Sequence, residues 1–277
     1  MSTVDAWLEL AKIPDDHERV DAWVASYEAS SPSIFDVYYS AWGDTARRAT
    51  AALQAPTLVG QIKAAEDRAR HLLSVAARNF RERGLLSDEL HVVLLVGGHS
   101  SNGWVAEHNG RRTLFLALEY LGSPPYDDLL VVHELSHVSQ GLLSPATRAR
   151  TYSTSLAVMV EGAATAITRA LRPGHTDSAY LWMDETHAEW LDACSASASA
   201  IAALLLQHAD TPDDADAVAP LLRNRDTAAI PPRSGYWAGD LIAREILHEG
   251  NDLKELLSMS AAEARRRVLA WASTQRA

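Results

Sequence analysis

Apolar residues recur every three or four positions along most of the chain, which is the spacing of amphipathic helices. In residues 4–53 this spacing is interrupted at Pro14 and Pro32, so we expect several short helices there. A longer helix is expected over residues 59–83, because its apolar residues fall on one face and Gly84 follows it. The first part of the chain is therefore predicted to be helical.

The period changes in the middle of the chain. Residues 90–96, LHVVLLV, form a compact β-branched run. Residues 104–107 and 112–120 are two more extended segments, and the Asn109-Gly110 pair between them is a hairpin turn signal. We therefore predict a small antiparallel sheet here.

Helical spacing returns after residue 123. The expected helices cover residues 124–140, 153–171, 178–207, 213–222, 235–248 and 261–273. The pattern as a whole predicts a predominantly helical α+β fold with one small sheet. We divide the chain into an N-terminal helical region, residues 1–85, and a region of residues 86–277 that carries the sheet and the later helices. The two regions are expected to form one compact unit.

Charge and composition exclude several classes of protein. The formal net charge of -11 argues against nucleic-acid binding, which needs clustered Lys and Arg. Arginine runs such as residues 265–267 are interpreted as solvated helix faces. The N-terminus has no secretory-signal pattern, and no apolar run approaches the roughly 20 residues of a membrane span. Cys194 is the one cysteine, which fits a reducing compartment, and we expect it to be packed in a helix. We therefore expect a cytoplasmic protein without a membrane partner.

The most informative segment is VVHELSHVSQG, residues 131–141. His133 and His137 are four residues apart, so on a helix they project from the same face. Two imidazoles so placed can bind one Zn²⁺, and Glu134 can then reach a water on the metal and act as the general base. The flanking residues are apolar, so these side chains would be costly to bury without partners. We predict a zinc site, and two histidines without a metal are the alternative.

A third ligand must come from another segment. The metzincin pattern is excluded, because Gln140 and Leu143 stand where that class has Gly and His. Glu161 is the charged residue in an apolar, small-residue stretch of the next predicted helix, and Gly162 beside it would let the two helices approach closely. We predict Glu161 as the third ligand. An ion pair with an arginine is its alternative role, and the rival ligands are Asp184, Glu185 and His187.

An HExxH motif followed by an EGxA-type helix resembles the gluzincin metallopeptidases, and more narrowly a bacterial family of predicted zinc-dependent proteases. The GYxxG segment of that family, which follows a loop with Pro and Arg, is similar to PPRSGYWAG, residues 231–239. The resemblance covers residues 90–246. It implies zinc, peptidase chemistry and a functional role for Tyr236. The chain departs from the family at Ala163 and Asp240, where Leu and an aromatic residue are usual, so no substrate preference is carried over.

These observations predict a zinc-dependent metallopeptidase that acts on a peptide or protein. Tyr236 is the candidate hydrogen-bond donor to the oxyanion of the reaction, with a half-buried aromatic role as its alternative. Asp240 could orient Tyr236 or a ligand histidine. His99 could line the cleft or be an ordinary loop residue. Two other functions stay open, a non-catalytic zinc protein that binds a partner and a metallohydrolase of non-peptide substrates.

Overall fold

The structure is a computed structural model that describes residues 2–86, 89–149, 151–225 and 229–275. It is 68% helical with a three-stranded mixed sheet, which confirms the predominantly helical α+β fold. The chain divides into two compact units. Unit 1 comprises Met1–Asn79 and Ser87–Glu134, and unit 2 comprises Phe80–Leu86 and Leu135–Ala277. Most of the predicted N-terminal helical region therefore belongs to the same unit as the sheet.

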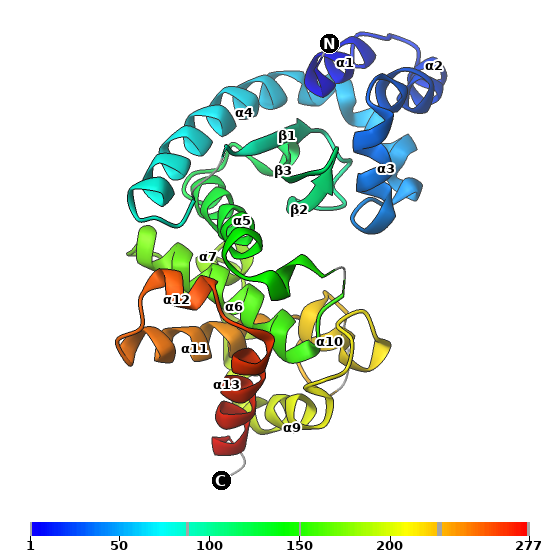
Figure 1. Ribbon diagram of the computed structural model, residues 1–277. Coiled ribbons are helices and arrows are strands. Elements are labelled where there is room, and N and C mark those ends of the chain that lie inside the picture. Colours follow the sequence, from blue (N-terminus) through cyan, green and yellow to red (C-terminus); the bar gives the residue numbers. More distant parts are fainter. Residues whose placement is uncertain (1, 87–88, 150, 226–228, 276–277) are drawn as a thin grey trace. The chain divides into compact units, whose positions relative to one another are not determined.

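Unit 1 begins with short helices, of which α1 lies beside β1 and α3 beside β2 (Figure 1). They are α1 (Thr3–Leu10), α2 (Asp16–Ala22) and α3 (Pro32–Ala41), with a π-helical turn at Trp23–Tyr27 and a 3₁₀ turn at Glu28–Ser30. The predicted interruptions at Pro14 and Pro32 are confirmed. Pro32 is the first residue of α3, where its missing N–H costs no helical hydrogen bond.

Helix α4 (Arg48–Glu82) begins earlier than predicted and contains Pro56 in its interior. Proline has no N–H, so the carbonyl of Ala52, four residues earlier, loses its helical partner. Arg19 replaces that partner, because its Nε donates a hydrogen bond of 2.7 Å to the Ala52 carbonyl. Arg19 is buried. A long-range contact thus lets the helix continue through a residue that normally breaks it.

The sheet consists of β1 (His91–Leu95), β2 (Gly103–His108) and β3 (Arg111–Ala117) in the order β1-β3-β2. Strands β2 and β3 form the predicted antiparallel hairpin, with Asn109 and Gly110 both at positive φ. Strand β1 pairs with β3 in parallel, so the small sheet that was predicted to be antiparallel is a mixed sheet. After β1 the chain forms β2 at the opposite edge of the sheet, and β3 then returns to the central position between β1 and β2.

The described helices that follow the sheet differ from the prediction in number and in several of their bounds, and α12 was not predicted. They are α5 (Tyr126–Leu143), α6 (Thr154–Leu171), α7 (Asp177–Trp182), α8 (Ala188–Ala196), α9 (Ala198–His208), α10 (Ala219–Leu222), α11 (Ser234–His248), α12 (Leu253–Leu257) and α13 (Ala261–Thr274). The single helix predicted over residues 178–207 is three helices, because Met183 has a left-handed φ of 59° and the chain bends at Ser197. The helix predicted over residues 213–222 is mostly loop and 3₁₀ turn.

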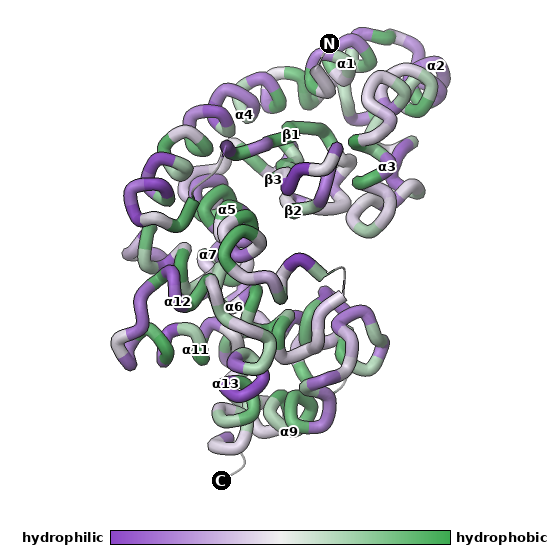
Figure 2. The backbone as a smooth tube through the Cα atoms, viewed as in Figure 1, coloured by the Kyte–Doolittle hydropathy of each residue, from purple (hydrophilic) through white to green (hydrophobic). Residues whose placement is uncertain are grey.

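Hydrophobic residues are concentrated along β1 and α5, whereas α4 carries hydrophilic stretches (Figure 2). The apolar residues of α5, among them Leu129, Val131 and Leu135, are buried. Among the described residues no single helix is long and apolar enough to cross a membrane. In the same described part of the chain, one pair, α8 and α9, bent by 67°, reaches that length and composition jointly.

Helices α6 and α11 of unit 2 are in backbone contact at two glycines. A Cβ added to Gly162 would lie 2.1 Å from the carbonyl carbon of Gly239, and one added to Gly239 would lie 2.2 Å from the Val158 carbonyl oxygen. Real Cβ atoms do not approach backbone this closely, so neither position accepts a side chain without a shift of the helices. Gly162 does allow close helix packing, but its partner is α11 and not the HExxH helix for which the close approach was predicted.

The Gly162→Ala substitution is expected to lower the free energy of unfolding by about 1–3 kcal/mol, because the added methyl group must push α11 away. Urea denaturation measures this change. Gly60→Ala in α4 is the matched control, since nothing lies within 4 Å of a Cβ at that position. It should be neutral or stabilise by up to about 1 kcal/mol. Equal stability of the Gly162→Ala protein would contradict the tight contact.

Candidate metal centre

The HExxH segment lies in helix α5, and the apolar residues around it are buried. His133 is 7% exposed and Glu134 is 5% exposed, so both polar side chains lie inside the protein. His137 and Glu161 retain 14% and 22% exposure of their side chains. His137 and Glu161 are therefore the more exposed members of this group of four side chains.

The three predicted ligands come together. The ligand atoms of His133, His137 and Glu161 all lie within 4.8 Å of one another. His137 Nε2 and Glu161 Oε2 are 3.4 Å apart. Two atoms that are each about 2.0–2.1 Å from a tetrahedral zinc ion are about 3.3–3.4 Å from each other. Two imidazoles and a carboxylate are also a donor set that Zn²⁺ accepts, so the residues present fit this metal.

The rival ligands lie outside this group. His187 Nδ1 is 2.7 Å from Asp184 Oδ1, and Glu185 accepts a hydrogen bond from Thr176. All three belong to the segment between α7 and α8. Their ion pair and hydrogen bond stabilise that segment.

Gln140 determines which nitrogen of His137 faces Glu161. Its Nε2 donates to the Val160 carbonyl at 2.8 Å, and a carbonyl can only accept. Gln140 Oε1 must therefore face His137 Nδ1, which lies 2.8 Å away and must carry the proton. In the neutral imidazole the lone pair is then on Nε2. Buried Gln140 thus turns the metal-binding nitrogen of His137 toward Glu161. It also links α5 to Val160, the residue before Glu161.

This arrangement leaves two acceptors facing each other. The Nε2 lone pair of neutral His137 and the Glu161 carboxylate are 3.4 Å apart, and they repel unless a cation lies between them. A proton on Nε2 would satisfy this pair alone. His133 adds a third ligand atom close to this pair. A metal ion can bind all three ligand atoms, whereas a proton on Nε2 is shared by two. The donor set therefore favours a metal.

The Gln140→Leu substitution is expected to weaken zinc binding by about 10–100-fold, since His137 loses the acceptor that orients it. Competition with a chromophoric chelator measures the dissociation constant. Gln140→Glu keeps an acceptor for His137 Nδ1 and should retain most of the affinity. Ser139→Ala is the control for packing in α5, because the buried Ser139 hydroxyl has no hydrogen-bond partner among the described residues. Unchanged affinity in the Gln140→Leu protein would remove this role.

Gly103, at the start of edge strand β2, packs against the proposed base. A Cβ at Gly103 would lie 2.7 Å from Cγ and 2.9 Å from Cδ of Glu134. The φ of Gly103 is not positive, so this glycine provides space rather than an unusual backbone conformation. We did not predict it, although a glycine that opens an extended run before a hairpin was visible in the sequence.

Tyr236 lies in the first turn of α11 and is half-buried. One turn later Gly239 touches Gly162, the neighbour of Glu161. The helix that carries Tyr236 is thus packed directly on the helix that carries the carboxylate ligand. The guanidinium carbon of Arg233 lies 4.3 Å from the centroid of the Tyr236 ring.

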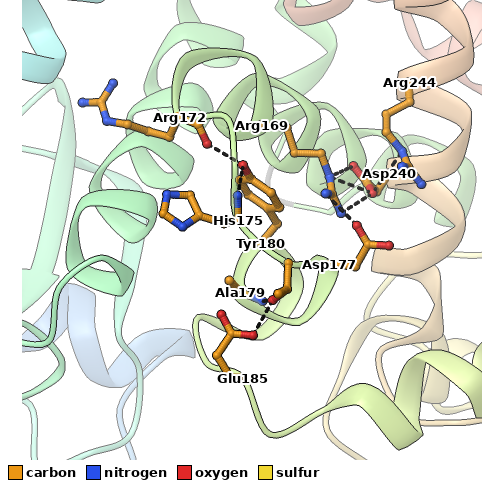
Figure 3. A network of polar contacts seen from close by, with 10 residues as sticks. Arg169, Arg172, His175, Asp177, Ala179, Tyr180, Glu185, Asp240 and Arg244 are labelled. Carbon is orange, nitrogen blue, oxygen red and sulfur yellow. Dashed lines mark hydrogen bonds and ion pairs between the residues drawn. The ribbon is translucent and has the colours of Figure 1, made fainter.

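Asp240 has a different role from the one predicted (Figure 3). Its carboxylate is 3.0 Å from Arg169 of α6 and 3.4 Å from Arg244 of α11, and it is 1% exposed. Burial raises the pKa of the Asp240 carboxyl above its usual value, although both arginines act to lower it. The prediction that Asp240 orients Tyr236 or a ligand histidine is corrected to an ion pair between α6 and α11.

Two further residues behave as loop and core residues. His99 has a φ of 59° in the loop after β1, and its backbone N–H donates to Glu119. Cys194 is buried, and desolvation raises the pKa of its thiol to about 12, as expected for a packed cysteine. Neither residue belongs to the metal-ligand group.

Function has to be inferred from the residues of this site and their geometry. Comparison with protein-family models, with curated proteins and with solved structures found no match to this chain.

Proposed function

We propose that this chain is a zinc-dependent metallopeptidase, with His133, His137 and Glu161 as the metal ligands. One observation carries the proposal: two imidazoles and a carboxylate converge within 4.8 Å, and Glu134 directly follows the first ligand on a buried helix. The resemblance of the HExxH, EGxA and GYxxG segments to the gluzincin metallopeptidases supports the same chemistry.

Zinc, when bound, supplies a Lewis acid that lowers the pKa of a water toward ~7. Glu134 accepts the proton of the attacking water and returns it to the leaving amine. The Tyr236 hydroxyl donates a hydrogen bond to the negative charge that develops on the scissile carbonyl oxygen. Gln140 holds His137 in the tautomer that leaves Nε2 free for the metal. Each role belongs to one side chain and can be tested separately.

The proposal is favoured over a structural zinc protein by the ligand set. Structural zinc sites are usually closed by four protein ligands, often cysteines, whereas catalytic sites keep one position for water. In the described part of the chain the group has three ligand side chains, and Cys194 is not among them. This group of three ligands, in which His137 and Glu161 are partly exposed, suits a catalytic zinc site.

Peptide-library cleavage tests the proposed function. Zinc-loaded wild type should cut members of an unbiased library, as detected by mass spectrometry. A chelator should abolish the cleavage and added zinc should restore it. Zinc-loaded Glu134→Gln protein is the matched negative control. Stoichiometric zinc without cleavage of any peptide would overturn the peptidase, and hydrolysis of ester or amide probes alone would assign a non-peptide substrate.

A further inference from the structure

Arg233 is held in an unusual position at the start of α11. It is the residue before the helix, and its φ of 57° and ψ of 18° are left-handed. A non-glycine residue in this region carries a conformational cost. Its backbone N–H donates to the Arg223 carbonyl at 3.2 Å. The local fold therefore fixes the direction in which the Arg233 side chain leaves the backbone.

The Arg233 guanidinium lies close to the faces of two aromatic rings. Its central carbon is 4.4 Å from the Trp182 centroid and 4.3 Å from the Tyr236 centroid. Trp182 is itself stacked on His187 at 4.1 Å, and the Trp190 indole donates to the Pro232 carbonyl. These contacts hold the guanidinium on a rigid platform. Contacts with ring faces supply no carbonyl or carboxylate oxygen to the N–H groups of the guanidinium.

The N–H donors of Arg233 find no acceptor among the residues that the structure describes. Among the described residues, the Arg233 guanidinium makes no hydrogen bond and no ion pair. The half-buried arginines of unit 2 that pack between helices behave differently, since Arg169 and Arg267 both pair with carboxylates. The chain carries a net charge of -11, so acidic partners are abundant. A fixed guanidinium without one is suited to an external anion.

Arg233 is also placed next to Tyr236, the proposed donor to the oxyanion. It contacts Tyr236. Three residues farther along α11, a rise of about 4.5 Å, Gly239 touches Gly162 beside Glu161. All of these residues belong to unit 2. An anion held by Arg233 would therefore lie close to the residue proposed to assist the scissile carbonyl.

We propose that Arg233 binds a carboxylate of the substrate, so that the enzyme prefers peptides with a free carboxylate near the scissile bond. This inference rests on the proposed peptidase function. A guanidinium fork binds a carboxylate through two parallel charge-assisted hydrogen bonds. The carboxylate can be the C-terminus of a short peptide or an Asp or Glu side chain. Either source uses the same pair of donors.

Matched substrates test this preference. Each peptide that zinc-loaded wild type cleaves is prepared as the C-terminal acid, as the C-terminal amide, and as the amide with one Glu or Asp added near the cleavage site. We expect a carboxylate form to have a 10–100-fold higher kcat/KM than the plain amide, about the value of a charged hydrogen bond, mainly through KM. The favoured form identifies the source of the carboxylate.

Arg233→Gln should remove this preference, and Arg233→Lys should restore only part of it, because lysine keeps the charge but not the fork. Arg223→Gln in the same loop is the control and should keep the preference, since Arg223 is exposed. Thermal unfolding of each variant confirms that it is folded. A preference that persists in Arg233→Gln, for instance because the metal itself binds the carboxylate, would overturn the proposal, as would the lack of any preference in wild type.

A binding measurement separates this proposal from the peptidase function. Zinc-loaded Glu134→Gln protein is titrated calorimetrically with N-acetyl-alanyl-alanine, with its C-terminal amide, and with the C-terminal α-amide of N-acetyl-alanyl-glutamate, which keeps only the side-chain carboxylate. Tighter binding of a carboxylate form, lost in the Glu134→Gln, Arg233→Gln double variant, supports the site even if no peptide is cleaved. Equal binding of acid and amide forms would overturn it even if cleavage is observed.

Discussion

Zinc-loaded Glu134→Gln protein is expected to hydrolyse peptides about 10²–10⁴-fold more slowly than wild type, with its zinc content unchanged. Glutamine has the shape of glutamate but accepts no proton at neutral pH. It also fits the space beside Gly103, where a Cβ would already lie 2.7 Å from the Glu134 side chain. The substitution therefore removes the base without removing a metal ligand.

The measurement for this variant combines kcat/KM for one library peptide with elemental analysis of the same sample. Ser139→Ala, on the same buried helix, should keep both values and serves as the control. A Glu134→Gln protein with wild-type turnover would remove Glu134 from the mechanism. A variant that loses its zinc would instead show that the carboxylate supports the metal site.

The Asp240→Ala protein is expected to lose about 3–5 kcal/mol of unfolding free energy. Removing one member of a buried ion pair leaves the other charge uncompensated, and Arg169 is only 15% exposed. Arg169 keeps one remaining ionic partner, Asp177, at 2.7 Å, so the loss should lie toward the lower end of that range. Tyr180 keeps its ring 4.3 Å from the Arg169 guanidinium carbon.

Asp177→Ala is the matched control for this ion pair. The Asp177 side chain is 50% exposed, so its removal should cost less than about 1 kcal/mol. Urea denaturation of both variants gives the comparison. A small loss for Asp240→Ala, or equal losses for the two variants, would contradict the structural role of Asp240. An Asp240→Ala protein that keeps its full stability but loses turnover would instead indicate a role for Asp240 in the active site.

The sequence predicted the site elements well because their signals are local. The expected helix over residues 153–171 is α6, Thr154–Leu171, since Ser153 caps its start and Pro173-Gly174 follow its end. The histidine spacing and the isolated charge of Glu161 were likewise readable without a structure. Periodicity and burial cost were sufficient for the three proposed ligands.

Features that depend on distant contacts could not be predicted in this way. Helix α4 continues through Pro56 because Arg19, far away in the chain, donates the hydrogen bond that the proline cannot donate. The parallel pairing of β1 with β3 depends on the path of a loop. The role of Gln140 follows from the backbone carbonyl of Val160, and the role of Asp240 from arginines on two helices. In each case the deciding partner lies outside the local pattern.

The metal itself provides the most direct test of the proposed centre. Purified wild type is analysed for zinc by elemental analysis and X-ray absorption, beside Glu161→Ala and the control Glu185→Ala. We expect one zinc per chain bound by two imidazole nitrogens and a carboxylate oxygen. We expect that zinc to be retained in Glu185→Ala and largely lost in Glu161→Ala. Wild type that binds no divalent metal, or Glu161→Ala that binds zinc as tightly as wild type, would contradict the centre.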